Sequence, residues 1–356
     1  MATIRDVARR AGLSVATVSA VLNNKPVVSE RSRRKVLQAI EELDYRPNRV
    51  ARALSRNSSN TVGMLVPSVD NPFFPQVVKS VEDVFFENHF VTLIGNTEGK
   101  PERALYYIKS MLSGWADGLI ITLTWEMTQP EVLDNLKRAR VPVVGLAGAR
   151  IIPEFDAIIP DDTEGAFDAV SYLVDLGHRQ IGFIGVQDSQ STALRLQGYK
   201  DALQQAGLPV HNDLIMLGRG YEKADGYMLA KALMCCSPRP TAVFCYNDVM
   251  ALGALTALRE ENIRIPEDVS LMGFDDTAGP YCHPQFTSVA LPKSEMGFLA
   301  ASLLLDRIRG KEGPPETVTV RPRLVVRDST GPGPHLRDKA ARASKERSQT
   351  FVQTKR

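Results

Sequence analysis

The sequence predicts a small all-α domain at the N-terminus, followed by a larger α/β domain made of two lobes. Residues 1–45 contain short stretches in which apolar residues recur every three or four positions, the period of an amphipathic helix. Residues 61–330 alternate β-rich runs with helical stretches, which is typical of parallel sheets covered by helices. The two parts also differ in charge: residues 1–60 carry a net charge of +7, and residues 61–330 carry −10.

Composition limits what the protein can do. Apolar residues make up 44% of the 356 residues, so a folded core is expected. We find no run of roughly 18 to 20 apolar residues and no secretory signal, and therefore expect a cytoplasmic protein with no membrane partner. The four cysteines form no CxxC pairs and predict reduced thiols. A basic head on an acidic body suggests a polyanion-binding module, although a merely solvated basic surface would carry the same charge.

Two short helices joined by a tight turn are predicted at the start of the chain. Thr3 is the expected N-cap of the first, with Asp6 three positions later where a capping box places an acid. Gly12 breaks this helix, and Ser14 can cap the second, which covers residues 14–25. The apolar faces that would pack together are formed by Ile4, Val7, Ala8, Ala11, Val18 and Val21. This is the helix-turn-helix pattern.

The second helix exposes small and hydroxyl side chains where a surface helix usually carries Lys and Glu. A helix that enters a DNA major groove, about 12 Å wide, needs such side chains, because hydroxyls reach phosphates or bases and methyls meet thymine. Each residue alone could be a tolerated surface Ser or Thr, but pattern, position and charge together favour DNA binding. Base-edge contacts are expected from Val15, Ala16, Thr17 and Ala20, a phosphate contact from Ser19, and further DNA contacts from Thr3, Ser14 and Asn23.

A third helix and a marginal fourth one complete this region. The third begins at about Glu30, capped by Ser29, and its expected core residues are Val36, Leu37, Ile40 and Leu43. Residues 47–60 predict a hinge helix and linker, too short to be stable alone in water. If this segment folds against DNA, Leu54 becomes a minor-groove wedge; otherwise it is a linker whose Leu54 rests on the body. The DNA-contacting residues predicted here are Arg49, Arg52, Ala53, Leu54 and Arg56.

The acidic body contains ten β-rich runs, and the series divides near Pro160. There are too many strands for one ordinary sheet, so two similar α/β lobes are expected, with the ligand site in the cleft between them. Polar and aromatic residues follow several of these runs, where strand ends would face the cleft. They include Asp70, Phe73 and Phe74 after the first run, Arg195 after a loop, and Asn247 and Asp275 after two later runs.

These stretches resemble the LacI/GalR family of bacterial transcription regulators over residues 2–330. The matching segments are TIRDVARRAGLSVATVSAVLNNKPVVSERSRRKV, LDYRPNRVARALSR, LGHRQIGFIG, RPTAVFCYND, MALGAL, IPEDVSLMGFDD and PRLVVRDS. The resemblance implies a helix-turn-helix head, a hinge helix that forms on operator DNA, and an effector body similar to periplasmic sugar-binding proteins. The implied boundaries are 1–46 for the head, 47–60 for the hinge, 61–160 with about 292–319 for one lobe, and 161–291 with about 320–330 for the other. The composition of residues 331–356 predicts a disordered basic tail, which either adds nonspecific DNA affinity or is an inert extension.

The resemblance also places effector-contacting residues at Phe73 or Phe74, Arg195, Tyr221, Asn247 and Asp275. Vicinal hydroxyls of a ligand would suit these residues, because Arg195 can donate hydrogen bonds, Asp275 can accept them, and Asn247 can do both. Taken singly, Phe74 could be a core residue and Arg195 could form a salt bridge between lobes. Two positions depart from the family. Ala20 stands where relatives often have a larger polar residue, and Ala147 stands where many have an acidic residue that takes a sugar hydroxyl.

The sequence therefore predicts a DNA-binding transcription repressor controlled by a small-molecule effector. The expected effector is a sugar or sugar derivative, with a nucleoside or purine-type corepressor as the alternative. We expect a homodimer that binds a near-palindromic operator, because a two-fold symmetric protein matches two-fold symmetric DNA. The dimer interface could be formed by Phe85, Phe86 and the helix after Pro101. An enzyme is the less favoured interpretation, because GxGxxG, GxxxxGK[ST], GxSxG and HExxH are absent and the five histidines lack metal-ligand spacing. Neither a cofactor nor a metal is expected.

Overall fold

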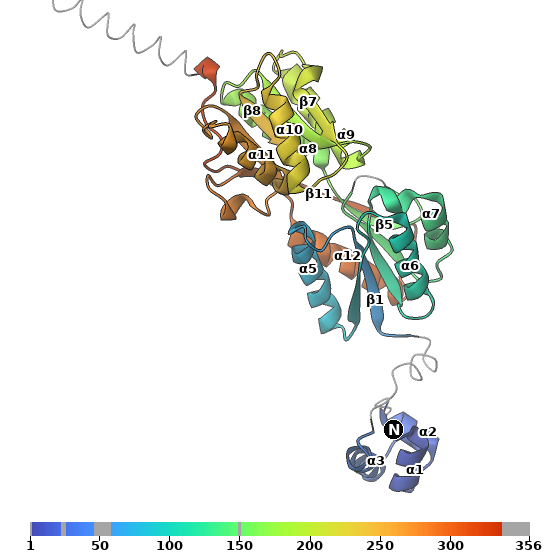
Figure 1. Cartoon of the computed structure of the whole chain (residues 1–356). Coiled ribbons are helices and arrows are strands. Elements are labelled where there is room, and N and C mark those ends of the chain that lie inside the picture. The colour runs from blue at the N-terminus through green and yellow to red at the C-terminus, as the bar shows by residue number, and fades with distance from the viewer. Residues whose placement is uncertain (1, 23–25, 46–57, 149–150, 337–356) are drawn as a thin grey trace, which may run out of the picture. The chain divides into compact units, whose positions relative to one another are not determined.

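The computed structural model describes residues 2–22, 26–45, 58–148 and 151–336. The chain divides into two compact units, Met1–Asn60 and Thr61–Arg356 (Figure 1). We call the first unit the head and the second the effector body. Among the described helices, none combines the length and the apolar character that a membrane span needs.

In its described residues, 2–22, 26–45 and 58–60, the head contains three helices around a small apolar core. They are α1 (Ile4–Ala11), α2 (Val15–Leu22) and α3 (Glu30–Glu42). Thr3 and Asp6 form the predicted capping box of α1, and Gly12 ends the helix in the left-handed conformation, with φ 65°. The buried core residues are Val7, Ala8, Ala11, Val18, Val21, Val36 and Ala39. The helix-turn-helix that the sequence predicts is therefore present, since α1 and α2 both pack on α3.

One core prediction in the head is wrong. Leu37 is 53% exposed, whereas Ala39 is 2% exposed and takes the inward position. The inward face of α3 is centred on Val36 and Ala39, three positions apart, and Ile40 and Leu43 lie at its margin. Leu37 follows Val36 by one position, about 100° around the helix, and so faces outward.

The effector body contains two six-stranded sheets. In the first, the strand order is β11-β5-β4-β3-β1-β2, and in the second it is β12-β10-β9-β8-β6-β7. Every pair is parallel except β10 with β12. The bounds are β1 Thr61–Val66, β2 Val91–Asn96, β3 Gly118–Thr122, β4 Val143–Leu146, β5 Asp156–Pro160, β6 Ile181–Val186, β7 Ile215–Gly218, β8 Ala242–Cys245, β9 Ser270–Asp275, β10 Thr287–Ala290, β11 Thr317–Val320 and β12 Arg323–Val325.

Helices cover both faces of each sheet, as Figure 1 shows. We call the first sheet with its helices the N-lobe and the second the C-lobe. The N-lobe helices are α5 (Phe73–Glu87), α6 (Pro101–Leu112), α7 (Pro130–Lys137) and α12 (Lys293–Ile308), with the 3₁₀ turn η1 (Trp125–Thr128). The C-lobe helices are α8 (Asp162–Asp175), α9 (Gln190–Gln205), α10 (Lys223–Met234) and α11 (Asp248–Glu260), with the 3₁₀ turns η2 (Asn212–Leu214) and η3 (Gly279–Tyr281).

The chain passes between the lobes three times, between β5 and α8, between β10 and α12, and between β11 and β12. Helix α12 therefore belongs to the N-lobe, where it packs against α5 and β3–β5. All ten predicted β-rich runs contain a strand. Strands β11 and β12 were not among them. Each is only three or four residues long and joins the edge of a sheet already formed by earlier strands.

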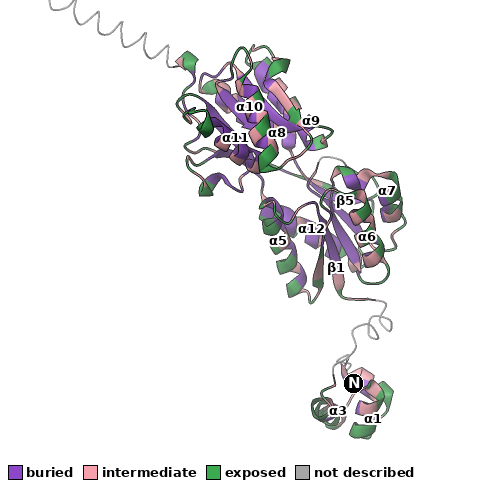
Figure 2. Ribbon diagram, in the orientation of Figure 1, coloured by how far each residue is buried: buried purple, intermediate pink, exposed green. Residues whose placement is uncertain are grey.

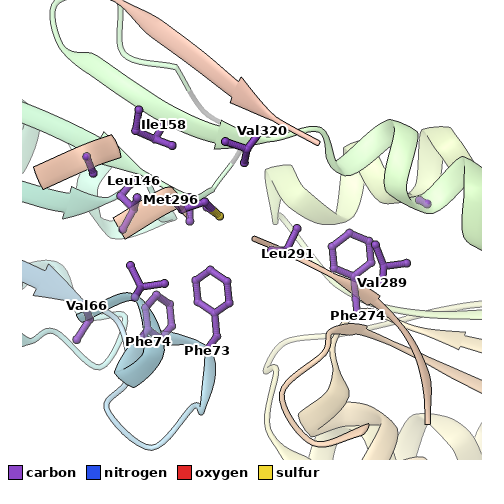
Figure 3. Close-up of a cluster of buried hydrophobic side chains, with 14 of the residues drawn as sticks. Val66, Phe73, Phe74, Leu146, Ile158, Phe274, Val289, Leu291, Met296 and Val320 are labelled. Atoms are coloured by element: carbon purple, nitrogen blue, oxygen red, sulfur yellow. The ribbon is translucent and has the colours of Figure 1, made fainter. Parts of the chain in front are cut away.

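The buried side chains form one core inside each lobe and a further cluster that continues across both. Figure 2 marks the buried residues of both lobes in purple. This shared cluster includes Phe73 and Phe74 from α5, Phe274 from β9, and Leu291 from the crossing segment. Figure 3 shows Leu291 between the N-lobe side chains and the C-lobe pair Phe274 and Val289. The crossing between β10 and α12 is therefore apolar and packed, which joins the two lobes mechanically.

The start of the predicted tail is ordered and belongs to the C-lobe. The Gly331 amide donates to Ser270 Oγ at 3.0 Å, and the Gly333 amide donates to the Leu176 carbonyl at 2.7 Å. The boundary at residue 330 is therefore wrong: the C-lobe extends to at least Leu336. The glycines of GPGP, which suggested a break, instead allow close backbone packing, because a Cβ on Gly333 would lie 2.6 Å from the Gly177 carbonyl carbon. Residues 337–356 lie outside the described part of the chain.

Candidate functional site

The outward face of α2 carries the residues that the sequence predicts to contact DNA. Ser14 Oγ accepts a hydrogen bond from the Thr17 amide at 3.1 Å, so Ser14 caps the helix and anchors its first turn. Val15 is 41% exposed. Ala16 is exposed, and Thr17, Ser19 and Ala20 are partly exposed, while the inward face is formed by Val18 and Val21. The helix therefore presents small and hydroxyl side chains to its surroundings, as a major-groove helix requires.

Several predicted DNA contacts cannot be placed on this surface. Thr3 is exposed at the N-cap of α1, where its hydroxyl bonds to Asp6. Residues predicted to contact DNA that lie outside the described part of the chain are Asn23, Arg49, Arg52, Ala53, Leu54 and Arg56.

In the effector body, a cavity of about 620 Å³ lies between the lobes. Its wall begins where strands of both sheets end, since Pro67 follows β1, Ala147 follows β4, and Tyr246 follows β8. The carboxyl ends of parallel strands are the usual ligand-binding edge of open α/β sheets. Six of the seven residues predicted to contact an effector line this cavity: Phe73, Phe74, Arg195, Tyr221, Asn247 and Asp275.

Arg195 is the centre of the buried polar network of the cavity. Its side chain projects from α9 and is only 5% exposed. Nε and Nη2 donate to Asp162 Oδ1 at 3.0 and 2.9 Å, and Nη1 donates to the Tyr246 carbonyl. The guanidinium also stacks on the Phe274 ring, 3.6 Å from its centroid. Two of its five N–H groups remain free of these bonds and can donate to a ligand.

Asp275 contributes a carboxylate to which no described residue donates a hydrogen bond. It ends β9 with φ 89° and is 8% exposed. The nearest guanidinium nitrogen, Arg195 Nη2, lies 3.9 Å from Oδ1, beyond hydrogen-bond length. Burial raises the pKa of Asp275 to about 6, despite the attraction of Arg195. A ligand that donates hydrogen bonds here would compensate for this desolvation.

Asn247 lines the cavity at the start of α11, and its neighbour Asp248 supports the site from outside the wall. Asn247 Oδ1 accepts from the Met250 amide at 2.8 Å, which caps the helix and leaves the side-chain amide to face the cavity. Asn247 is therefore oriented mainly as a donor, whereas the sequence suggested that it would both donate and accept. Asp248 is fully buried, and Oδ2 accepts from the amides of Thr277, Ala278 and Gly279. It thereby holds the loop that follows Asp275.

Aromatic side chains from both lobes complete the wall. Phe73 and Phe74 are 5% and 8% exposed and meet edge to face, with ring centroids 5.1 Å apart. Both belong to the shared apolar cluster and also border the cavity, so the core and ligand-binding interpretations of Phe74 are compatible. Tyr221 reaches the cavity from the C-lobe, and burial raises its pKa to about 12.

Asp70 does not belong to this site. Its side chain is exposed, and the residue is not part of the cavity wall. Asn71 takes the place at the wall instead, and its Oδ1 accepts from the Phe73 amide at 3.0 Å at the start of α5. The turn between β1 and α5 directs Asp70 outward, which strand-end reasoning alone could not resolve.

The structure adds residues that the sequence analysis missed. Asp162, 1% exposed, is the partner of Arg195 and begins α8 immediately after the first crossing. Its Oδ2 is buried without a hydrogen-bond partner among the described residues. Glu126, 2% exposed, and the exposed Trp125 enter the wall from η1. Both acids follow predicted strands, so the strand-end rule could have found them. Within the described ranges, no group of three His, Cys, Asp or Glu is arranged to hold a metal ion.

A helix-turn-helix head joined to a two-lobed body with a polar interlobe cavity defines a DNA-binding regulator of the ligand-responsive class. Residues 3–48 match the model described as bacterial regulatory proteins, lacI family, and residues 170–330 match that of a periplasmic binding protein-like domain. The relative HTH-type transcriptional repressor PurR of Vibrio vulnificus (strain CMCP6) is 38% identical over 334 residues, covering 92% of this chain and 98% of the relative. The chain therefore belongs to the LacI family of transcriptional repressors.

Solved structures agree with this assignment. The lac repressor dimer bound to operator and the anti-inducer ONPF matches with a TM-score of 0.82 at 27% identity, covering 93% of this chain and 99% of that chain. A complex of the transcriptional regulator CelR with cellobiose matches with a TM-score of 0.70 at 30% identity, covering 92% and 100%. PurR of Escherichia coli O1:K1 is 36% identical over 337 residues, covering 94% of this chain and 98% of the relative.

Proposed function

We propose that this repressor binds near-palindromic operator DNA as a homodimer, and that a hydroxyl-rich, sugar-type effector in the interlobe cavity controls that binding. The observation that carries the effector class is the buried trio of Asp162, Arg195 and Asp275. No described residue donates a hydrogen bond to the carboxylate of Asp275 or to Asp162 Oδ2, and two N–H groups of Arg195 are not used by the bonds to Asp162 and Tyr246. Adjacent hydroxyls, which both donate and accept, suit this pattern.

The coupling between effector and DNA follows from where the cavity lies. Its wall includes Phe74 and Glu126 of the N-lobe and Arg195 and Asp275 of the C-lobe. A ligand that touches both lobes stabilises the lobe arrangement in which both sets of contacts form. The effector then changes DNA affinity by its differential binding to two arrangements of the body. As a repressor of bacterial genes, the protein would act in the cytoplasm.

Exposed apolar residues of the N-lobe support the homodimer. Phe86 on α5 is 73% exposed, Tyr106 on α6 is 69% exposed, and Ile94 on the edge strand β2 is 48% exposed. Exposed apolar side chains and uncovered sheet edges are features of protein interfaces. Phe85, which was also expected on this surface, is fully buried in the shared cluster and belongs to the core.

A purine-type corepressor is the second candidate effector. The aromatic side chains Phe73, Phe74 and Trp125 in the cavity wall favour it, because a flat heterocycle stacks on such rings. The buried trio of Asp162, Arg195 and Asp275 would then bind the edge of a base.

The proposed function is tested with the full-length purified chain. Binding sites are selected from a random duplex pool, and their affinity is measured by fluorescence anisotropy at several salt concentrations. We expect a two-fold symmetric consensus and a dimer in sedimentation. Cellobiose, D-ribose and purine bases are then added singly to the protein–operator complex. A response to a sugar supports the first effector class, and a response to purine bases alone replaces it with the second. Failure to enrich any sequence would refute the assignment as an operator-binding repressor.

A further inference from the structure

The buried part of the cavity holds more negative than positive charge. Among the described residues, four carboxylates line the cavity, Glu126, Asp162, Asp188 and Asp275, against the guanidinium groups of Arg195 and Arg219, and no described Lys or His is part of the wall. Asp188 and Arg219 are exposed, so solvent screens their charges. Among the described wall residues, the buried remainder is three carboxylates and one guanidinium. The buried ammonium of Lys293 is not part of the wall, and it donates to the backbone carbonyls of Asp275 and Asp276.

Three of the five N–H groups of that guanidinium already bond to protein partners. Arg195 gives two hydrogen bonds to Asp162 and one to the Tyr246 carbonyl. Its positive charge is therefore largely compensated before any ligand enters. The Lys293 ammonium is likewise occupied by two backbone carbonyls. An anionic ligand would therefore meet no uncommitted buried cation among the described wall residues and would lie near Asp275 and Glu126, where like charges repel in a weakly screened environment.

Glu126 is the only charged residue that the described part of the N-lobe places in the wall. Its Oε1 accepts from Thr97 Oγ1 at 2.9 Å, and Thr97 is fully buried behind it. This bond fixes the carboxylate, while no described residue donates to Oε2. The described residues after β4 that line the same wall, Ala147 and Gly148, carry no polar side chain. The carboxylate acceptor on the N-lobe side of the wall is therefore Glu126 of η1.

We infer that Glu126 is the N-lobe acceptor for the effector and the residue that restricts the site to neutral or amino-bearing sugars. Its carboxylate accepts a hydroxyl or ammonium donor from one end of the ligand, while Asp275 accepts at the other end. Sugar phosphates and sugar acids are excluded by the same charges. This inference rests on the proposed sugar-type effector, and it adds the charge class and the N-lobe determinant.

The chain has a convenient optical readout for the test. Of its two tryptophans, Trp125 lines the cavity, and Trp115 does not. In a Trp115→Phe background, tryptophan emission therefore reports on ligands at the site. The probes are matched by ring and differ in charge: D-glucose, D-glucosamine, D-glucuronate and D-glucose 6-phosphate, together with cellobiose and D-ribose.

The variant Glu126→Gln keeps an oxygen for Thr97 and removes the charge. Glu131→Gln is the control, because Glu131 is an exposed N-lobe carboxylate paired with Lys109 outside the cavity wall. We expect a neutral or amino sugar to bind, both anionic probes to fail, and Glu126→Gln to weaken that binding about tenfold, which matches loss of a charged hydrogen bond. Glu131→Gln should leave affinity unchanged, and equal melting temperatures would show that both variants fold.

Two results would overturn the inference: an anionic probe that binds as tightly as its neutral counterpart, or unchanged affinity in Glu126→Gln. Binding of none of the sugars would also overturn it, since the ligand class would be wrong. Sequence-specific DNA binding, measured separately, would still stand in each of these cases, so failure here is distinct from failure of the repressor assignment.

Discussion

Replacing Asp275 by Asn should make the free protein more stable at neutral pH while removing its effector response. Asp275 is buried, its carboxylate accepts no hydrogen bond from the described residues, and its pKa is raised to about 6 from 3.8, chiefly by desolvation. Arg195 and Lys293 attract its charge, whereas Asp248 and Asp162 repel it. Asn has a similar shape and no charge, so the desolvation cost disappears.

The magnitude follows from proton linkage. Between pH 3.8 and about 6 the folded state holds the Asp275 proton more tightly than the unfolded state does, so wild-type stability falls as pH rises through this window. At 1.36 kcal/mol for each unit of pKa, the loss is about 3 kcal/mol by pH 7.5 and only about 1 kcal/mol at pH 4.5. Asp275→Asn avoids this loss, so its advantage should be large at pH 7.5 and small at pH 4.5.

The assay is urea unfolding followed by tryptophan emission, because Trp115 and Trp125 both lie in the effector body. Asp276→Asn is the matched control: Asp276 forms an ion pair with Arg327 at 2.7 Å, so its loss should not stabilise the protein. An Asp275→Asn variant that is no more stable than wild type at pH 7.5, or that gains equally at both pH values, would show that Asp275 is not held at a desolvation cost.

Three further outcomes are expected. Leu54→Ala should weaken specific operator binding while sparing salt-dependent nonspecific binding, and an unchanged ratio of the two affinities would rule out the minor-groove wedge. Arg195→Lys should lower the free energy of unfolding, measured with urea, by about 2 to 3 kcal/mol and abolish the effector response, because an ammonium group cannot replace the planar guanidinium that holds Asp162 and the Tyr246 carbonyl. An unfolding free energy equal to that of the wild type would contradict this. Gly253→Ala should cost about 3 kcal/mol in the same assay, since its Cβ would meet the Lys223 carbonyl of α10, and a neutral effect would show that the helices can separate.

The head was predictable because its signals are local. The capping box of Thr3 and Asp6, the turn at Gly12 and the apolar spacing of α1 and α2 each span only a few residues. The exposed Leu37 shows the limit of this approach. Val36 and Leu37 are adjacent apolar residues, and only the packing of α3 on the other two helices decides which of them is buried.

The strands of the effector body show a similar division. Buried parallel strands such as β3 and β9 are almost wholly apolar and stand out in the sequence. Strands β11 and β12 carry exposed residues and exist because the chain returns to the free edge of each sheet. The ordered segment 331–336 likewise depends on backbone contacts with residues distant in sequence.

By itself, the sequence determined the two-part architecture, the exposed face of small and hydroxyl side chains on α2, and the positions of Arg195, Asn247 and Asp275 after predicted elements, because these follow from periodicity, caps and strand ends. Only the tertiary structure decided that Asp162 neutralises Arg195, that Asp275 lacks a donor, that Glu126 enters the wall and that Asp70 does not. Burial and pairing between distant segments set the charge of a buried group, and no local pattern contains that information.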